Sequence, residues 1–177
     1  CHPHVVAAIA RQAAILNTNT RYLFDEVLQF AERLSAQFPA GLTSCMFVNS
    51  GSEAVDLGWR LAKAYTGNAG ALVMEYAYHG WTDAVEALSP EIRKDHRKPH
   101  VRMLLGPDDY RGPYRRGDND IAERYAADAD RAIASLAEGG YQPAMFIADA
   151  GFLTNGVLDA PKGYLQGVYD RVRKAGG

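Results

Sequence analysis

A run of small residues between an apolar segment and a helical pattern is the first place where this sequence could do chemistry. Phe47-Val-Asn-Ser-Gly-Ser-Glu-Ala54 carries the chain through such a turn, with Ser50, Gly51 and Ser52 at its centre. Small side chains let a phosphate approach the backbone, where the first unpaired N–H groups of a helix favour an anion. The segment therefore predicts an anion site with Gly51 and Ser52 as N–H donors.

The same turn also has a purely structural interpretation. Ser50 and Glu53 have the spacing of a capping box, in which each side chain accepts a hydrogen bond from a backbone N–H and no ligand is needed. Taken by itself, the segment favours this second interpretation. Gly51 is not followed by the Gly-Lys-Ser/Thr signature of a nucleotide-binding P-loop, so the sequence excludes a Walker-type site.

Two further polar positions follow apolar runs. Tyr78, His79 and Gly80 come shortly after residues 71–74, and a tyrosine ring there could lie flat on a planar cofactor. Asp149 comes just after another apolar run, and its carboxylate could accept a hydrogen bond from a cofactor substituent. The structural alternatives are an aromatic side chain at the core edge with a backbone-bonded histidine, and an aspartate that caps the following turn. Taken singly, these positions leave both interpretations open.

Other reactive or metal-binding side chains give weaker signals. Cys1, His2 and His4 match no zinc-binding spacing, so no metal site is expected, and Cys45 lies in an apolar run that favours a buried thiol. Residues 89–117 form an irregular stretch, which we expect to be a solvated surface loop, with an anion-contacting loop as the alternative. Its charged side chains include Arg93, Lys94, Asp95, Arg97, Lys98, Asp108, Asp109, Arg111, Arg115 and Arg116.

These candidate positions need a scaffold, and the hydrophobic pattern predicts one. Helical spacing is present over residues 6–16, 23–38, 50–66, 121–136 and 165–172, with Asn19-Thr20 expected to cap the second helix. Short apolar runs, expected as strands, cover residues 45–48, 71–74, 101–105 and 144–147. Wholly apolar strands that alternate with amphipathic helices predict an α/β fold of three layers, α/β/α, with a mostly parallel sheet. Ligands bind such sheets at the carboxyl ends of the strands, where the candidate residues lie.

The composition excludes several classes of protein. The chain has 177 residues, a formal net charge of −2, 47% hydrophobic residues and 23% charged residues. These values exclude an intrinsically disordered chain and give no basic field for nucleic acid. No apolar stretch approaches the roughly 20 residues that a membrane span requires. Cys1 and Cys45 cannot form a disulfide framework, so we expect a reducing compartment, the cytoplasm.

Four segments taken together resemble a known family. His2-Pro-His-Val-Val6, Leu16-Asn-Thr-Asn-Thr-Arg-Tyr-Leu23, residues 47–54 and Tyr78-His-Gly-Trp-Thr82 occur in the order and at the spacing of class III aminotransferases. The second segment is similar to that of the branch containing alanine–glyoxylate aminotransferases and amino-alcohol phosphate phospho-lyases. Because four ordered motifs are more specific than one, the resemblance favours the ligand-binding interpretation of the turn and of the tyrosine.

The resemblance implies an enzyme of the aspartate-aminotransferase fold, fold type I, that uses pyridoxal 5′-phosphate. The turn would bind the cofactor phosphate, Tyr78 would stack on the pyridine ring, and His79 would be its neighbour. Asp149 stands where the family usually has a glutamate near the ring oxygen of the cofactor. The cofactor-binding residues implied in this way are Ser50, Gly51, Ser52, Tyr78, His79 and Asp149.

The resemblance also implies a part that this sequence does not contain. The family's fold continues with a strand that bears the aspartate of the pyridine nitrogen, and later with the Schiff-base lysine. Lys63 would lie at least ~15 Å along its helix from the phosphate turn, and Lys162 follows a proline at a helix start. We therefore expect residues 1–177 to be part of the large cofactor-binding domain, without the lysine-bearing half and the small C-terminal domain, and to be inactive alone.

For the whole enzyme, the resemblance implies amino transfer between an amino acid or amine and a 2-oxo acid, catalysed by a homodimer. The alternative reaction is elimination of phosphate from a phosphorylated amino alcohol. A third hypothesis, from a different class, is a non-catalytic α/β module that retains a phosphate-binding turn.

Overall fold

A computed structural model describes residues 1–19, 21–91 and 98–177. The chain divides into two compact units, Cys1–Phe47 and Val48–Gly177, and each is described by itself. The residues of the sequence motifs and of the basic stretch that lie outside the described ranges are Thr20, Arg93, Lys94, Asp95 and Arg97.

The first unit begins with a helix, α1 (Pro3–Ile15), whose start is fixed by its own side chains. Pro3 occupies the first helical turn, where a missing N–H breaks no hydrogen bond, and the His2 Nδ1 atom accepts a hydrogen bond from the His4 N–H at 3.3 Å. The imidazole of His2, one of the side chains considered as metal ligands, therefore caps the helix in the structure.

The second helix, α2 (Asp25–Ser35), has acidic residues in its first turn, which the helix dipole favours. The residue at its cap position is Phe24, and the Asn19 side chain instead accepts a hydrogen bond from the Arg21 N–H. The predicted Asn19-Thr20 cap is therefore wrong, because Asn19 stabilises a local turn before the helix starts.

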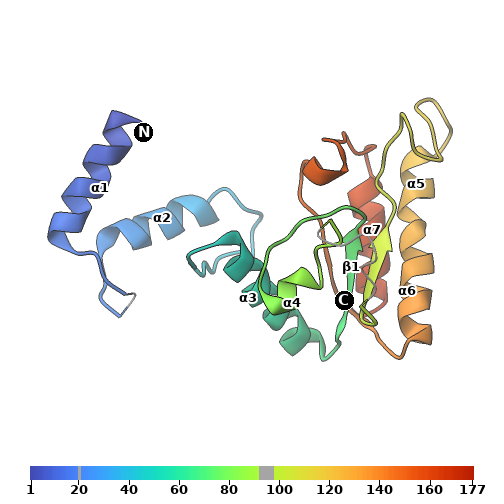
Figure 1. Ribbon diagram of the computed structural model, residues 1–177, viewed down its shortest axis with the longest axis horizontal. Helices are drawn as coiled ribbons and strands as arrows, with labels where there is room; N and C mark the ends of the chain where they lie inside the picture. Colours follow the sequence, from blue (N-terminus) through green and yellow to red (C-terminus); the bar gives the residue numbers. More distant parts are fainter. Residues whose placement is uncertain (20, 92–97) are drawn as a thin grey trace. The chain divides into compact units, whose positions relative to one another are not determined.

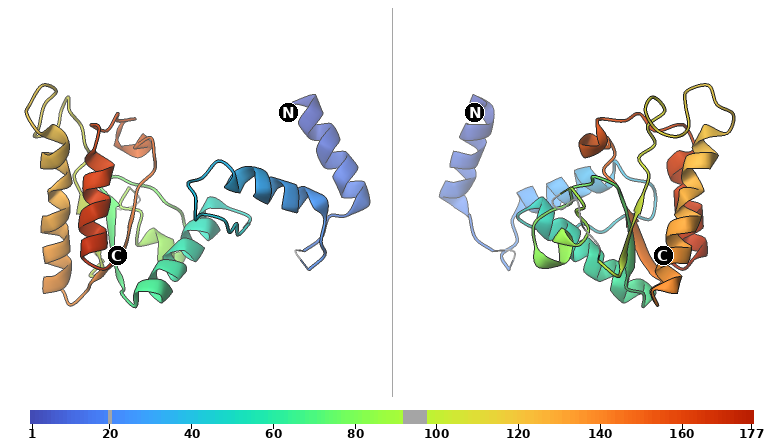
Figure 2. Two further views of the ribbon diagram at one scale, coloured as in Figure 1. Left: turned by 180° about the vertical axis from the view of Figure 1, so that it is seen from behind. Right: turned by 45° about the vertical axis from the view of Figure 1, so that its right-hand side comes forward.

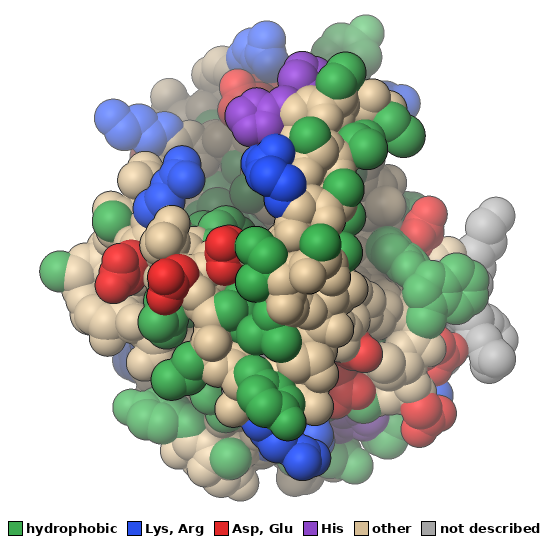
Figure 3. Space-filling model, turned by 90° about the vertical axis from the view of Figure 1, so that its left-hand side faces the viewer, with side chains coloured by type: hydrophobic (Ala, Val, Ile, Leu, Met, Phe, Trp, Pro, Cys, Tyr) green, Lys and Arg blue, Asp and Glu red, His purple; other side chains and the backbone are tan. Residues whose placement is uncertain are grey.

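Neither helix of the first unit buries a residue completely. Figure 3 shows hydrophobic side chains at the surface that it displays. The exposed large hydrophobic residues of this unit include Val5, Val6, Ile9, Ile15, Leu23, Leu28, Phe30 and Phe38. The strand predicted at residues 45–48 is wrong: the segment has no regular secondary structure, because no strand of the described sheet pairs with it.

The second unit is built on a parallel sheet of three strands. β1 (Gly70–Met74) lies in the middle, between β2 (Val101–Leu104) and β3 (Pro143–Ile147). All three strands were predicted from their apolar runs, and both pairings, of β1 with β2 and of β1 with β3, are parallel. The carboxyl ends of the strands therefore lie at one end of the sheet.

Helices cover both faces of this sheet, which confirms the predicted three layers (Figures 1 and 2). One face is covered by α3 (Gly51–Thr66) and the short α4 (Asp83–Glu86), and the other by α5 (Ile121–Ala126), α6 (Asp128–Glu138) and α7 (Tyr164–Lys174). Within the described ranges, no helix has both the length and the apolar character needed to cross a membrane.

The single helix predicted over residues 121–136 consists of two helices. Ala127 ends the first of them, and the Asp130 N–H donates to the Ala127 carbonyl at 3.0 Å, a spacing of three residues where a regular α-helix has four. The apolar spacing continues across this interruption, so the pattern of side chains does not reveal it.

β1 contributes alternate side chains to two hydrophobic cores. Leu72 and Met74 pack in the core beneath α5, α6 and α7, whereas Ala71 and Val73 pack in the core that contains Trp59 of α3. This two-sided burial explains why the strand is apolar throughout. It also fixes the register of the sheet, and with it the positions of the segments that follow each strand.

Candidate functional site

The Ser-Gly-Ser turn (residues 50–52) joins the preceding segment to α3. The Ser50 Oγ atom accepts a hydrogen bond from the Glu53 N–H at 3.1 Å, and the Glu53 Oε2 atom accepts one from the Asn49 N–H at 2.6 Å. This reciprocal pair confirms the predicted capping box. Its effect is to fix the start of the helix by means of the chain's own side chains.

The capping box leaves two backbone donors of the turn unused. Within the described residues, the N–H groups of Gly51 and Ser52 have no hydrogen-bond partner. A Cβ atom placed on Gly51 would meet no atom within 4 Å, so the space beside this backbone is open. The structural and the anion-binding interpretations are therefore compatible, because they use different donors of the same turn.

The Tyr-His-Gly segment (residues 78–80) lies directly against this turn. Gly80 has a φ of +140°, and a Cβ atom placed on it would lie 2.6 Å from the Ser52 Oγ atom and 2.8 Å from the Ser52 Cα atom. The Trp81 N–H donates a hydrogen bond to the Ser52 Oγ atom at 3.0 Å. The structure thus brings together two predicted segments that are separated along the chain, and this contact requires a glycine.

Tyr78 lies at the surface, with 37% of its area exposed. Its ring packs edge-to-face with that of Trp81, with ring centroids 6.2 Å apart and an angle of 77° between the planes. The tyrosine therefore has an aromatic neighbour and retains exposed surface for a further planar group.

His79 is half-buried, and its environment keeps the ring neutral. Burial lowers the pKa of His79 below its ordinary value of 6.5, whereas the negative charge of Asp149 acts in the opposite direction. The Nε2 atom is buried and has no hydrogen-bond partner in the described structure. A neutral imidazole in this position has a polar atom available for one further hydrogen bond.

Asp149 caps the turn that follows β3, as the structural alternative proposed. Its Oδ1 atom accepts hydrogen bonds from the Gly151 N–H at 3.0 Å and the Leu153 N–H at 3.1 Å. The electrostatic effect on His79 shows that the same carboxylate also lies near the imidazole. The ends of β1 and β3 therefore place a carboxylate and a histidine in one neighbourhood.

Sequence reasoning missed two polar residues in this region. Ser89 is fully buried and hydrogen-bonds with the Tyr-His-Gly segment. Asn155 donates a hydrogen bond to the Glu75 carbonyl at 2.6 Å, while the Glu75 side chain accepts one from the Gly106 N–H at 2.9 Å, which links the ends of all three strands. Neither residue belongs to a motif, so no signal in the sequence distinguished them from ordinary turn residues.

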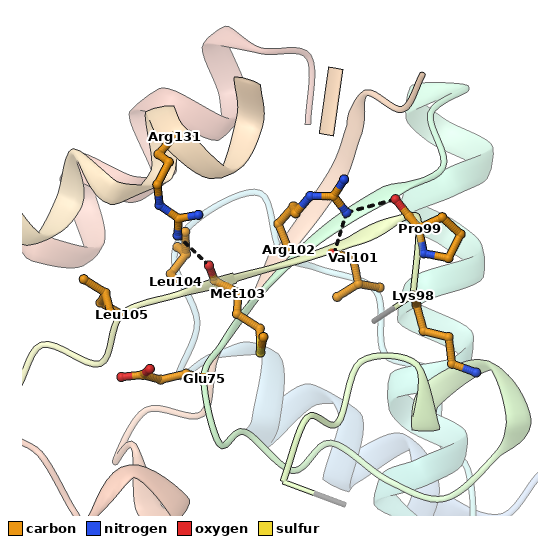
Figure 4. Close-up of a pocket in the computed structure, with 9 residues that line it drawn as sticks. All are labelled: Glu75, Lys98, Pro99, Val101, Arg102, Met103, Leu104, Leu105 and Arg131. Atoms are coloured by element: carbon orange, nitrogen blue, oxygen red, sulfur yellow. Dashed lines mark hydrogen bonds between the residues drawn. The ribbon is translucent and has the colours of Figure 1, made fainter. Parts of the chain in front are cut away.

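A surface hollow of about 530 Å³ beside β2 is a poor candidate for the site (Figure 4). Arg131 at its rim pairs with Asp128 and donates a hydrogen bond to the Met103 carbonyl, and Arg102 donates one to the Val101 carbonyl. The cationic groups that would attract an anion to this hollow are therefore already engaged by the protein.

The lysines of the described residues lie elsewhere. Lys63 is in the last turn of α3, with its ammonium 4.9 Å from the centre of the Trp59 ring, and Lys98 forms an ion pair with Glu86 at 3.3 Å. Lys162 is exposed, and Lys174 ends α7. The Ser-Gly-Ser turn lies at the opposite end of α3 from Lys63.

Comparison with known proteins gives consistent matches over the whole chain. A sequence model of the family described as "Aminotransferase class-III" matches residues 1–174. The chain is 38% identical over 184 residues to "Alanine–glyoxylate aminotransferase 2-like" of Drosophila melanogaster, and 34% identical over 191 residues to "Ethanolamine-phosphate phospho-lyase homolog 1" of Caenorhabditis elegans. Both alignments cover 100% of this chain but only 37% and 40% of the relatives, so the chain spans about two fifths of their length.

Solved structures are also similar to this chain over nearly its whole length. A phospholyase from Arthrobacter in complex with phosphoethanolamine is similar to this chain with a TM-score of 0.88 and 38% identity, over 100% of this chain and 42% of that chain. A transaminase is similar with a TM-score of 0.81 and 26% identity, over 99% of this chain and 42% of that chain. An omega-aminotransferase from Paracoccus denitrificans, at 21% identity and a TM-score of 0.75, shares the fold over 98% of this chain and 41% of its own.

Proposed function

The chain belongs to the class III aminotransferase family, which depends on pyridoxal 5′-phosphate, and we propose that its second unit binds the phosphate and one face of this cofactor. In this proposal, the Ser-Gly-Ser turn binds the phosphate through the N–H groups of Gly51 and Ser52, and Tyr78 lies against the ring. The observation that carries the proposal is the pair of unpartnered N–H groups in a turn whose own cap is complete.

The donor groups of this site suit a phosphorylated planar molecule. A phosphate needs N–H donors at a helix start and free access to the backbone, and the turn has both. The buried Nε2 atom of His79 needs a hydrogen-bond partner, which a polar substituent of the ring would supply. Ser50 would hold the turn through its cap.

The other side chains would orient the bound molecule. One oxygen of Asp149 is used in capping, so its second oxygen would accept a hydrogen bond from a ring substituent. His79, kept neutral by burial, would contact the edge of the ring. When bound, the cofactor supplies an electron sink for the negative charge that develops on the substrate carbon next to the amino group.

For the whole enzyme, we propose amino transfer between an amino acid or amine and a 2-oxo acid. A second reaction, elimination of phosphate from a phosphorylated amino alcohol, is supported by the similarity to the Arthrobacter phospholyase and to the relative from C. elegans. Both reactions use the same cofactor, and the residues described here serve cofactor binding in either.

We further propose that residues 1–177 belong to the cofactor-binding domain of a longer, cytoplasmic and homodimeric enzyme that supplies the essential lysine from another segment, so that this chain alone is inactive. The two sheet edges support the first part of this proposal. Side chains hydrogen-bond to the outward carbonyls of β2. In β3, Asn68 donates a hydrogen bond to the carbonyl of the first residue, Pro143, at 2.9 Å, whereas among the described residues no side chain hydrogen-bonds to the backbone of residues 144–147. An edge left in this state is suited to pairing with a further strand.

Titration of this chain with pyridoxal phosphate tests the proposed site, with tryptophan fluorescence as the readout, to which the exposed Trp81 and the buried Trp59 both contribute. Pyridoxal, which has no phosphate, is the comparison ligand. The informative variant is Gly51→Pro. Gly51 is the first residue of α3, where proline is tolerated, and Ser50 has the extended backbone that precedes a proline. The variant therefore removes one N–H donor and preserves the helix start.

We expect Gly51→Pro to lower the affinity for pyridoxal phosphate about tenfold or more, because a hydrogen bond to a charged group contributes roughly 1.5 kcal/mol or more. The affinity for pyridoxal should not change. Gly58→Ala is the matched control, since Gly58 is exposed on the same helix and has open space for a Cβ atom. Equal binding of the two ligands to the unmodified chain, or no effect of Gly51→Pro, would contradict the proposed site.

A further inference from the structure

Ser89 is a fully buried polar side chain that follows α4. Its Oγ atom accepts a hydrogen bond from the His79 N–H at 2.9 Å, and lies 3.2 Å from the Gly80 carbonyl oxygen and 3.1 Å from the Val85 carbonyl oxygen. A serine hydroxyl has one hydrogen to donate, so the two carbonyls share it. The side chain therefore holds the Tyr-His-Gly segment at two points and joins it to α4.

Ser89 lies among buried apolar residues, so its hydroxyl is not in contact with water. Ala87, Leu88 and Pro90 are buried beside it. A hydroxyl in such surroundings is unfavourable unless it forms hydrogen bonds, and alanine would fill nearly the same volume without that cost. The hydroxyl is therefore best explained by the backbone groups to which it is bonded.

The contacts of Ser89 continue to the Ser-Gly-Ser turn. Ser89 binds the backbone on both sides of the peptide that links His79 to Gly80, and Gly80 packs directly on Ser52. The next residue, Trp81, donates its N–H to the Ser52 side chain. Ser89, Gly80 and Ser52 thus form a continuous series of contacts between α4 and the start of α3.

We propose that Ser89 is a positioning residue of the cofactor site, which holds the Tyr-His-Gly segment against the Ser-Gly-Ser turn and so sets the place of the Tyr78 and His79 side chains relative to the phosphate. This inference rests on the proposed function, because it assigns both segments to one ligand. Ser89 itself touches neither the ligand nor the reacting atoms.

Ser89→Ala tests the proposal, and Ser135→Ala is its matched control. Ser135 is a half-buried serine on α6 that accepts a hydrogen bond from Arg102 at 2.8 Å, and it lies on the other face of the sheet. The conservative variant Ser89→Cys retains the size of the side chain and a weak donor and acceptor. Each chain is examined by ¹H–¹⁵N correlation spectra without ligand, by thermal unfolding, and by titration with pyridoxal phosphate.

We expect Ser89→Ala to shift the amide signals of His79, Gly80, Trp81 and Ser52, and to lower the affinity for pyridoxal phosphate about tenfold. Ser89→Cys should recover part of this affinity. Ser135→Ala should lower the unfolding temperature but bind the ligand as the unmodified chain does.

The proposal is overturned if folded Ser89→Ala binds pyridoxal phosphate with unchanged affinity, or if Ser135→Ala loses as much affinity as Ser89→Ala. If Ser89→Ala does not fold, the same comparison between Ser89→Cys and Ser135→Ala decides. If the unmodified chain binds no pyridoxal phosphate, the proposed function fails, and the amide signal of Ser52 then decides only whether Ser89 holds the Tyr-His-Gly segment against the Ser-Gly-Ser turn. A shift of that signal on replacing Ser89 supports this positioning role, and no shift overturns it.

Discussion

Two regions of the second unit present polar backbone groups at the surface, and they differ in how those groups are satisfied. Along the outer edge of β2, Arg102 and Arg131 donate to the carbonyls of Val101 and Met103, and Asp128 accepts from the Leu105 N–H at 2.9 Å. At the Ser-Gly-Ser turn, two N–H groups have no partner in the described structure. The surface hollow of about 530 Å³ lies beside β2, whereas the unsatisfied N–H donors are those of Gly51 and Ser52 in the turn.

The proposed function places the ligand site at the turn because we expect unmet hydrogen-bonding capacity to be a better guide to such a site than volume. A hollow whose charges are already paired gives little binding energy, because a ligand would first have to displace the protein's own partners. The turn presents donors that no other group of the described residues occupies. Substitutions in the two regions should therefore have different consequences.

The largest expected effect comes from Gly80→Ala. The new Cβ atom would lie 2.6 Å from the Ser52 Oγ atom and 2.8 Å from its Cα atom, at a φ of +140° that side chains rarely adopt. Overpacking and backbone strain together should lower the free energy of unfolding by about 3 kcal/mol and separate the two segments, which abolishes cofactor binding. Denaturant unfolding and ligand titration check this, and a variant of unchanged stability would contradict the close contact.

Arg131→Ala should have a smaller effect of a different kind. Loss of its hydrogen bond to the Met103 carbonyl and of its ion pair with Asp128 should lower the free energy of unfolding by about 1 kcal/mol. The freed edge should increase concentration-dependent association in sedimentation. Arg60→Ala, at an exposed position of α3, is the control. A loss of cofactor affinity comparable to that of Gly80→Ala would remove the distinction between the two regions.

The smallest expected effect concerns the charge state of His79. Because Asp149 raises the pKa of His79 against the effect of burial, Asp149→Asn should lower that pKa further. The folded-state pKa lies below the unfolded value of 6.5, so the unfolded chain takes up the proton first as the pH falls. The stabilising contribution of neutral His79 is complete above 6.5 and is lost as the pH falls toward the folded-state pKa.

NMR titration of the His79 ring in the two chains measures this shift directly. Asp170→Asn, which changes an exposed carboxylate on α7, is the control and should leave the titration of His79 unchanged. An equal or higher pKa in Asp149→Asn would show that the carboxylate does not act on the imidazole.

The sequence predicts features whose causes are local. The apolar runs of the three strands and the spacing of Ser50 and Glu53 gave correct strands and a correct capping box, because each depends on neighbours along the chain. The run at residues 45–48 has the same composition but no pairing partner, so composition alone predicted a strand that is absent. A strand exists only where another strand completes its hydrogen bonds.

The candidate site shows the same difference between features with local causes and features that depend on contacts between distant parts of the chain. The Ser-Gly-Ser turn and Tyr78 were found from motifs, and their roles in cofactor binding remain predictions. Ser89 and Asn155 were not found, because each hydrogen-bonds to backbone groups that come close only in the folded chain. A side chain that hydrogen-bonds to the backbone can do so whatever the type of residue it contacts. A single sequence therefore contains no pattern that identifies such a side chain.

The close contact of Gly80 with Ser52 has a consequence for the entropy of binding. Two separate loops that must converge on a ligand lose conformational freedom when the ligand arrives, and that loss weakens the affinity. Here the two segments are already joined by a backbone contact and by the Trp81 hydrogen bond. If the two segments form the proposed cofactor site, most of the loss of freedom occurs when the chain folds, and the ligand should meet a surface that is preorganised before it binds.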